Sequence, residues 1–156
     1  MDTTGNAAER LGMSGPARSL LYRLAVESGL RAGELRSLTR SSFNLDDAEP
    51  SVTIQAAYAK SRREDTLPLR AGTAALLLEH LGGKMPGAAA FTMTDSTAKM
   101  FRKDLAEART AWLATHTMAN ERSEAVKSTF LLERDASGRY ADFHSLRHSF
   151  ISGLVA

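Results

Sequence analysis

The stretch that decides the fold is Phe143-His144-Ser145-Leu146-Arg147-His148-Ser149-Phe150. Apolar residues recur in it and just beyond it at helical spacing, at Leu146, Phe150 and Leu154. This spacing predicts a last helix that starts near His144. His144 lies three residues before Arg147, so both side chains would lie on the same side of one helical turn. An imidazole and a guanidinium placed in this way could hold one anion, and the imidazole could also move a proton.

A second stretch, Gly29-Leu30-Arg31-Ala32-Gly33-Glu34-Leu35, lies toward the other end of the chain. Before it, Pro16 suits a first helical turn, and leucines follow at helical spacing until Gly29, a residue typical of helix ends. We therefore expect a helix up to Gly29 and a short helix over about 32–39 that Arg31 opens. Together with Arg147, Arg31 would supply two guanidiniums able to clamp the non-bridging oxygens of one phosphate.

Between residues 43 and 69 the hydrophobic period changes to two, which predicts β-strands. Alternation over 52–58 indicates a half-buried strand, and residues 66–69 would return beside it as an edge strand because they contain a proline. Residues 43–45 could add a third strand. The expected result is a small antiparallel sheet with a hairpin whose tip, over 60–65, is charged.

The tip of this hairpin carries three cations, Lys60, Arg62 and Arg63. A lysine on a mobile tip could donate a proton to a leaving oxygen, and Lys60 is placed for this. Arg62 or Arg63 could be the functional cation instead. The structural alternative is that all three are solvated charges without a role in chemistry.

The rest of the chain predicts mainly helices. Residues 72–81 form one, which two glycines end, and residues 96–115 form a longer one. An apolar stripe on the longer helix should face the core: Met100, Phe101, Leu105, Ala108 and Trp112. Residues 117–128 are ambiguous, whereas 130–132 and 139–140 could pair as a second small hairpin. The predicted class is α+β, predominantly helical.

Basic residues beside this apolar stripe admit two interpretations. Lys99, Arg102 and Lys103 could contact a phosphate backbone, or they could be the solvated face of the helix. The net charge of the whole chain is +2, which is too small by itself to indicate a polyanionic partner. The clustering of the cations therefore carries more information than their number.

The chain has 156 residues, of which 43% are hydrophobic, and this fits one globular domain. Residues 1–14 are small and polar without a period, so we expect a flexible lead before a domain over 15–156. There is no cysteine, which excludes disulfides and thiolate metal sites and favours a reducing cytoplasm. No apolar run approaches the roughly 18 residues of a membrane span, so no membrane partner is expected.

Three of these motifs, taken in order, resemble those of the tyrosine recombinase (phage integrase) family. Its signature has an arginine in a G-L-R-x-x-E-L context, a lysine in a β-hairpin and an H-x-x-R pair. Residues 29–35 match the first element, Lys60 the second and residues 144–150 the third, including its L-R-H-[ST]-F run. The resemblance covers roughly residues 15–156. It implies the helical catalytic domain with a small antiparallel sheet that is found in DNA breaking-rejoining enzymes.

The resemblance also implies an activity, which is metal-independent breakage and rejoining of DNA in site-specific recombination, through a 3′-phosphotyrosyl intermediate. Arg31 and Arg147 would clamp the scissile phosphate. Lys60 would protonate the leaving 5′ oxygen, and His144 would assist proton transfer. Further DNA contacts would come from a second group of cations: Arg62, Arg63, Lys99 and Arg102.

The partner that the resemblance implies is double-stranded DNA, on which family members assemble as homotetramers. It implies no metal, no cofactor and no small-molecule substrate. The expected location is the cytoplasm, in association with the nucleoid.

The chain departs from the family pattern at the position of the nucleophile. In the family a tyrosine follows the H-x-x-R pair, whereas the tyrosines of this chain all precede Arg147: Tyr22, Tyr58 and Tyr140. We therefore expect a partial catalytic domain that lacks its C-terminal helices, through an expression boundary or a truncated gene, and that does not cleave DNA by itself. Two alternatives stay open: a non-catalytic module that binds DNA or a recombinase, and a tyrosine supplied in trans by a partner.

Each candidate site residue also has a structural alternative. Arg31 could pair with Glu34 at the surface, and Glu34 is better explained as a holder of arginine or backbone than as a base. His144 and Arg147 could form a buried polar pair that locks the last helix. His144 and His148, four residues apart, could face one metal ion, but no acidic residue lies between them and we expect no metal site.

Overall fold

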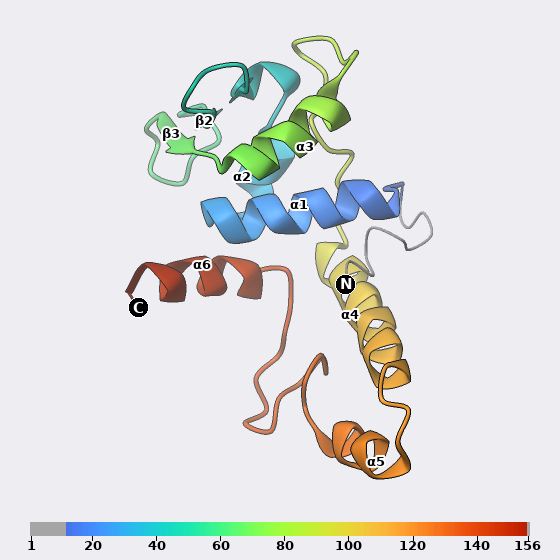
Figure 1. Ribbon diagram of the computed structural model, residues 1–156. Coiled ribbons are helices and arrows are strands. Elements are labelled where there is room, and N and C mark those ends of the chain that lie inside the picture. Colours follow the sequence, from blue (N-terminus) through green and yellow to red (C-terminus); the bar gives the residue numbers. More distant parts are fainter. Residues whose placement is uncertain (1–11, 156) are drawn as a thin grey trace.

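The computed structural model describes the backbone of residues 12–155 and the side chains of residues 12–153 (Figure 1). The flexible lead predicted for residues 1–14 therefore lies almost wholly outside the described residues, as does the side chain of Leu154. Over the described part, helices predominate and accompany one small three-stranded antiparallel sheet, which confirms the predicted α+β class.

α1 (Gly15–Ser28) is the central helix, with α3 on one side of it and α6 on the other (Figure 1). It begins after Ser14, whose hydroxyl accepts the N–H of Ala17 at 3.3 Å. It ends at Gly29, whose φ of +64° lies in the left-handed region that glycine takes without strain. The helix predicted up to Gly29 is confirmed, and its leucines are buried: Leu20, Leu21 and Leu24.

α2 (Ala32–Ser37) is shorter than the predicted helix over 32–39. Leu38 has an extended backbone instead, and its carbonyl accepts the N–H of Ala90 at 2.8 Å. Pairing of Leu38 with the segment that precedes α4 therefore ends the helix early. A short 3-10 helix, η1 (Arg40–Ser42), then leads into the sheet.

The sheet consists of three antiparallel strands in the order β1 (Phe43–Asn44), β2 (Ser51–Ile54) and β3 (Asp65–Pro68). All three predicted strands are present, but the predicted continuation of β2 to Tyr58 is wrong. The carbonyl of Gln55 accepts the N–H groups of Tyr58 and Ala59 at 3.0 and 3.1 Å, so the chain turns there. Residues 55–64 are therefore the loop of the β2–β3 hairpin.

α3 (Ala71–Leu81) packs against α1 and confirms the helix predicted over 72–81. One hydrophobic cluster joins α1, α2, α3 and the sheet. Its most completely buried aliphatic residues are Leu21, Leu24, Leu35, Leu38, Val52, Ile54, Leu77 and Leu81. α1, α2, α3, the sheet and α6 are called the body below.

α4 (Thr97–Ala114) and α5 (Ala119–Lys127) extend away from this cluster (Figure 1). The apolar stripe predicted as core on α4 is buried only at Met100, whereas Leu105 and Trp112 are half-buried. That prediction is wrong for most of the stripe because α4, beyond its first turns, faces α5 and the segment after it. α5 also gives a helix to the region whose structure the sequence left ambiguous. Residues 104–140 are called the α4–α5 lobe below.

The second predicted hairpin, of 130–132 with 139–140, is reduced to a single bridge between Arg134 and Tyr140. The carboxylate of Asp135 accepts the N–H groups of Ser137 and Arg139, both at 2.9 Å, and so closes the turn between them. Leu131 has a φ of +59°, which interrupts the extended run that a strand needs. The prediction of a hairpin is therefore wrong, although its turn is present.

α6 (Ser145–Val155) begins one residue later than the start predicted near His144. Its first turn is capped reciprocally, because the N–H of Ser145 donates to the Asp142 carboxylate and the N–H of Asp142 donates to the Ser145 hydroxyl, both at 3.0 Å. The helix packs against α1. This packing carries Arg147 to the C-terminal end of α1.

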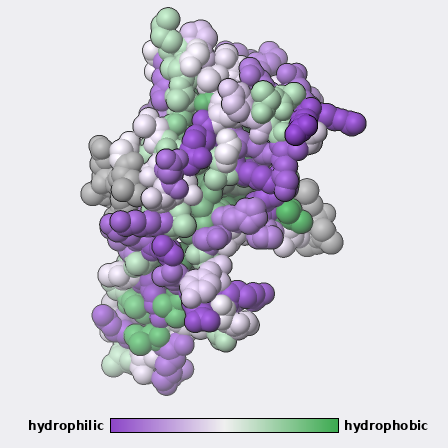
Figure 2. Space-filling model, turned by 180° about the vertical axis from the view of Figure 1, so that it is seen from behind, coloured by the Kyte–Doolittle hydropathy of each residue, from purple (hydrophilic) through white to green (hydrophobic). Residues whose placement is uncertain are grey.

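The surface of the α4–α5 lobe is partly apolar. Several large apolar side chains on it are exposed: Met118, Val126, Phe130 and Leu132. Figure 2 shows apolar side chains grouped over the lower part of the molecule, where α5 and the residues after it lie. Between residues 12 and 155, no helix is long and apolar enough to cross a membrane.

Candidate functional site

Arg31 and Arg147 line the same cleft, which has a volume of about 260 Å³. The end of α1, the start of α2 and one side of α6 form its walls, together with residues of the β2–β3 hairpin. The two arginines come from opposite ends of the described chain. Their convergence on one concave surface is the geometry that a two-guanidinium anion site requires.

Arg31 is the residue that precedes the first turn of α2. Its backbone N–H donates to Glu34 Oε2 at 2.8 Å, and its guanidinium Nη1 lies 3.3 Å from Glu34 Oε1. The side chain of Arg31 is 37% exposed, so the guanidinium is held on one side and open on the other. The pairing with Glu34 that was given as the structural alternative is therefore present, and it leaves donors of the fork for a ligand.

Glu34 is a buried carboxylate with an additional partner. The backbone N–H of Lys60, in the hairpin loop, donates to Glu34 Oε1 at 3.4 Å. One side chain therefore contacts the cap of α2, the guanidinium of Arg31 and the hairpin. A buried acid that accepts several hydrogen bonds fits the predicted structural role for Glu34 better than the role of a base.

Arg147 lies in the first turn of α6 and is half-buried. Its Nη1 donates to the carbonyl oxygen of Gly29, the residue that ends α1. This bond fixes one side of the guanidinium against the backbone and turns the remaining donors toward the cleft that both residues line.

Lys60 has an exposed side chain that does not line the cleft, although its backbone is tied to Glu34. Arg62 and Arg63 follow in the same loop and are exposed as well, with Arg62 at a φ of +55°. The three cations therefore stand on the loop beside the cleft, with their charged ends in solvent.

His144 lies outside the cleft that contains Arg147. It is exposed, and its ring packs edge-on against that of His148, with 5.1 Å between the ring centroids. The alternative of a buried pair formed by His144 and Arg147 is therefore wrong. His148 lines a different hollow, of about 520 Å³, together with Tyr140 and Arg139.

Lys99 and Arg102 lie on α4, which does not contribute to the cleft. Lys99 is exposed, whereas Arg102 lies 3.3 Å from Glu133 in an ion pair between side chains that are about half exposed. Arg102 therefore links α4 to the segment before α6. The pairing leaves other donors of the Arg102 guanidinium exposed to solvent.

Two residues of the cleft, Ser61 and Asp65, were not singled out from the sequence. Both belong to the hairpin, and its charged tip was the signal that could have drawn attention to them. Asp65 matters electrostatically, because a carboxylate beside the two arginines opposes the approach of an anion. The carbonyl of Gly29 was missed as well, since a backbone acceptor has no sequence signature.

One carboxylate with a shifted pKa lies outside the cleft. The pKa of Asp135, in the α4–α5 lobe, is lowered mainly by the backbone N–H of Arg139, with further contributions from the Arg139 guanidinium and the Ser137 N–H. Within the part of the chain that the structure describes, no group of three or more His, Cys, Asp or Glu side chains could hold a metal ion.

Comparison with known families gives one match, to the model described as the phage integrase family, over residues 6–156. The match includes every residue of the cleft. Comparison with curated proteins gave no significant match, and comparison with solved structures gave none either.

Proposed function

Because the chain belongs to the phage integrase family, a family of site-specific DNA recombinases, we propose that its cleft binds the scissile phosphate of double-stranded DNA. The observation that carries the proposal is the convergence of Arg31 and Arg147, each held on one side by the protein and open on the other. Paired guanidinium donors match the geometry of phosphate oxygens, and they gain strength as negative charge develops on those oxygens.

The reaction proposed for this site is a transesterification. A tyrosine oxygen would attack phosphorus and lose its proton to solvent, while the bond from phosphorus to the 5′ oxygen breaks. Arg31 and Arg147 would stabilise the charge that gathers on the two non-bridging oxygens. The departing 5′ oxygen would take a proton from the Lys60 ammonium, and the product would be a 3′-phosphotyrosyl link and a free 5′ hydroxyl.

Lys60 and His144 would need a change of position to take part. Lys60 extends from the hairpin loop into solvent, and its side chain would swing toward the substrate while its backbone N–H stays bonded to Glu34. His144 lies three residues before Arg147, just ahead of α6, and would approach the phosphate once DNA lies along that end of the helix. Its role in the proposal is to assist proton transfer.

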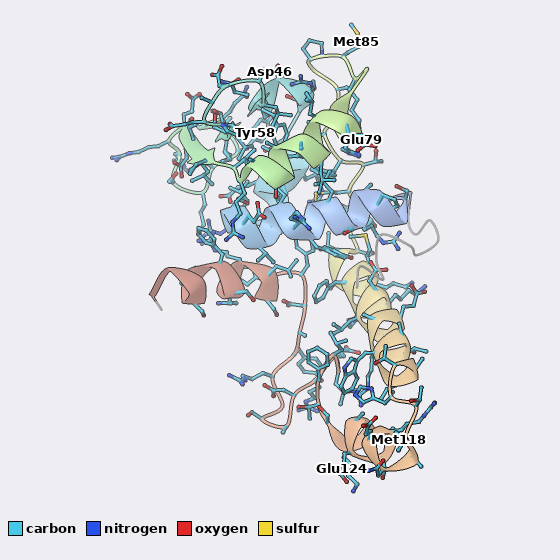
Figure 3. The ribbon with its side chains drawn as sticks, viewed as in Figure 1. Asp46, Tyr58, Glu79, Met85, Met118 and Glu124 are labelled. Atoms are coloured by element: carbon cyan, nitrogen blue, oxygen red, sulfur yellow. The ribbon has the colours of Figure 1, made fainter. Side chains whose placement is uncertain are left out.

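None of the chain's tyrosines lines the cleft: Tyr22, Tyr58 and Tyr140. The hydroxyl of Tyr22 donates to Asp104 at 2.6 Å, and its ring packs against Phe101. Tyr58 is exposed on the β2–β3 hairpin loop (Figure 3), and Tyr140 is exposed in the lobe. We therefore assign the nucleophile to none of the three and propose that residues 1–156 hold a DNA phosphate without cleaving it alone.

The same placement of the tyrosines supports a second candidate function, a non-catalytic module that binds DNA or a recombinase partner. A tyrosine supplied in trans by such a partner is the variant of this idea that retains catalysis. Restoration of cleavage when a full recombinase subunit is added would favour supply in trans, whereas inhibition of that subunit would favour the module.

The wider proposal concerns partners and location. Exposed Arg62, Arg63 and Lys99 would add contacts to the DNA backbone, as would the donors of Arg102 that do not face Glu133. The protein would assemble as a homotetramer on DNA, in the cytoplasm at the nucleoid. The proposal includes no metal, no nucleotide cofactor and no small-molecule substrate.

DNA affinity tests the arginine clamp directly. We expect Arg31→Ala and Arg147→Ala each to weaken binding of a labelled duplex by about tenfold to a hundredfold at fixed salt, since each removes a charge-assisted contact. Arg122→Ala is the matched control, because Arg122 is an exposed arginine of α5, outside the cleft. Equal affinities of the clamp variants and this control would contradict the proposal.

A suicide DNA substrate tests the assignment of the nucleophile. Residues 1–156 should bind the nicked duplex but leave no covalent protein–DNA adduct after denaturing electrophoresis. An adduct that Tyr22→Phe, Tyr58→Phe or Tyr140→Phe abolishes would show that the chain carries its own nucleophile.

A further inference from the structure

Gly29 contacts α6 at two points of its backbone. Its carbonyl oxygen accepts from Arg147 Nη1, and its Cα faces the ring of Phe150. A Cβ built on Gly29 would lie only 2.8 Å from Phe150 Cε1 and 2.9 Å from Phe150 Cγ. Nonbonded carbon atoms essentially never lie this close, so a side chain at this position requires Phe150 to move.

Phe150 and Arg147 are three residues apart on α6 and therefore share one side of that helix. Phe150 Cγ is close to the root of its side chain, so a small rotation of the ring would not relieve contact with a Cβ at position 29. The remaining responses are a new rotamer or a shift of α6 away from α1. A shift would take Arg147 with it.

Arg31 follows Gly29 by only two residues in the sequence. The distance between the two clamp arginines therefore depends on a short path, from Arg31 to Gly29 along the backbone and from Gly29 to Arg147 across the contact. We propose that the close approach of Phe150 to Gly29 positions Arg147 relative to Arg31 in the cleft. This rests on the proposed function of the cleft as a phosphate clamp.

A second explanation for the glycine must be separated from this one. The φ of Gly29 is +64°, which strains any other residue whether or not Phe150 is near. Gly83 provides a matched control, because its φ is +77° and a Cβ added there meets no atom within 4 Å. It follows α3 and does not line the cleft.

The test is a double-substitution cycle with duplex DNA affinity as the readout. We expect Gly29→Ala to weaken binding about tenfold, but only about twofold in a Phe150→Ala background, since alanine has no Cγ for the added Cβ to meet. The φ strain is present in both backgrounds and cancels. Gly83→Ala should lower the thermal midpoint and leave DNA affinity unchanged.

Phe150→Ala keeps the test decisive if Gly29→Ala does not fold. It deletes the ring that packs on Gly29 and leaves the backbone of α1 unaltered, and it should weaken DNA binding by a similar factor. Circular dichroism at the binding temperature establishes that each variant is folded.

Two results would overturn the proposal in distinguishable ways. Equal losses from Gly29→Ala in both backgrounds, or unchanged binding by Phe150→Ala, would refute the positioning contact while the arginine variants still lose affinity. Unchanged binding by Arg31→Ala and Arg147→Ala would refute the clamp itself, and the positioning proposal with it.

Discussion

In the body, α1 and α3 bury leucines completely, at Leu24 and Leu77, whereas in the α4–α5 lobe the residues of the same pattern stay half-buried. The lobe is stabilised instead by Arg109, which donates to the carbonyls of Val126 and Phe130. The rings of Trp112 and Phe130 also pack edge-on, with 4.9 Å between their centroids. Both arginines of the cleft belong to the body. The difference shows that the proposed clamp is mounted on the well-packed part of the molecule.

A buried polar contact joins the two regions. Arg18 Nε on α1 lies 2.8 Å from Asp104 Oδ2 on α4, and both side chains are almost fully buried. Asp104 also accepts a hydrogen bond from the Tyr22 hydroxyl. A buried ion pair stabilises only while both partners are present. A single substitution at this ion pair should therefore weaken the contact between body and lobe more than it weakens the packing within either region.

The largest expected effect is at this junction. Asp104→Ala should lower the free energy of unfolding by about 3–5 kcal/mol, because it removes a buried carboxylate that accepts from both Arg18 and Tyr22. The measurement is urea denaturation followed by circular dichroism and by the emission of Trp112, the single tryptophan and a reporter of the lobe. The emission midpoint should fall further than the midpoint from circular dichroism.

The control at the surface is Glu124→Gln, which removes an exposed ion pair with Lys127. Such a pair contributes about 0–1 kcal/mol, so this variant should unfold almost as the parent does. Similar losses for Asp104→Ala and Glu124→Gln would mean that the junction does not hold the two regions together.

A pair of leucine truncations compares the packing of the regions directly. Leu77→Ala in α3 should cost about 2–5 kcal/mol, because it leaves a cavity in a fully buried site. Leu113→Ala in α4 should cost about 1 kcal/mol, because that side chain is already half exposed. The midpoint of urea unfolding measures both, and equal costs would remove the distinction between body and lobe.

Arg109→Ala should have a smaller and more local effect. It removes two donors to backbone carbonyls and a cation 5.9 Å from the Trp112 ring, at a cost of about 1 kcal/mol. Hydrogen exchange should become faster in α5 and stay unchanged in α1. Faster exchange in α1 would show that the lobe supports the body.

The smallest effect concerns pH and Asp135. Its pKa in the folded protein is lowered from 3.8, mainly by the N–H of Arg139, so the carboxylate stabilises its turn at a pH above that value. This contribution should be lost as the pH falls below 3.8 through the lower folded pKa. Protection of the Ser137 and Arg139 amides from exchange, relative to their intrinsic rates at each pH, should fall over that window in the parent and show no such dependence in Asp135→Asn.

Local signals in the sequence predicted most of the elements. Pro16 and Gly29 marked the ends of α1, and both act within the backbone of their own helix, so no distant contact could overrule them. The length of β2 was misjudged because the alternation of residues 52–58 continues past Ile54, whereas its partner β3 does not. A strand needs a partner, which the pattern of one segment does not report.

The candidate site was predicted unevenly for the same reason. Motif order predicted that Arg31 and Arg147 would act together, and the structure brings them to one cleft. Local spacing suggested that His144 would share the side of Arg147, but α6 starts after His144 and leaves it exposed. Arg18 and Asp104 could not be paired from sequence, because many arginines and acids are available and only the fold selects two.

Glu34 gives the hairpin a fixed point. Because its carboxylate accepts the N–H of Lys60 as well as that of Arg31, the backbone of Lys60 is attached to the frame of the cleft while its ammonium group is free to swing. The ammonium group therefore moves by rotation about the side-chain bonds of Lys60, while the backbone stays in place. The length of the Lys60 side chain sets how far the ammonium group can reach. Insertions or deletions in residues 61–64 should therefore change the loop without changing that distance.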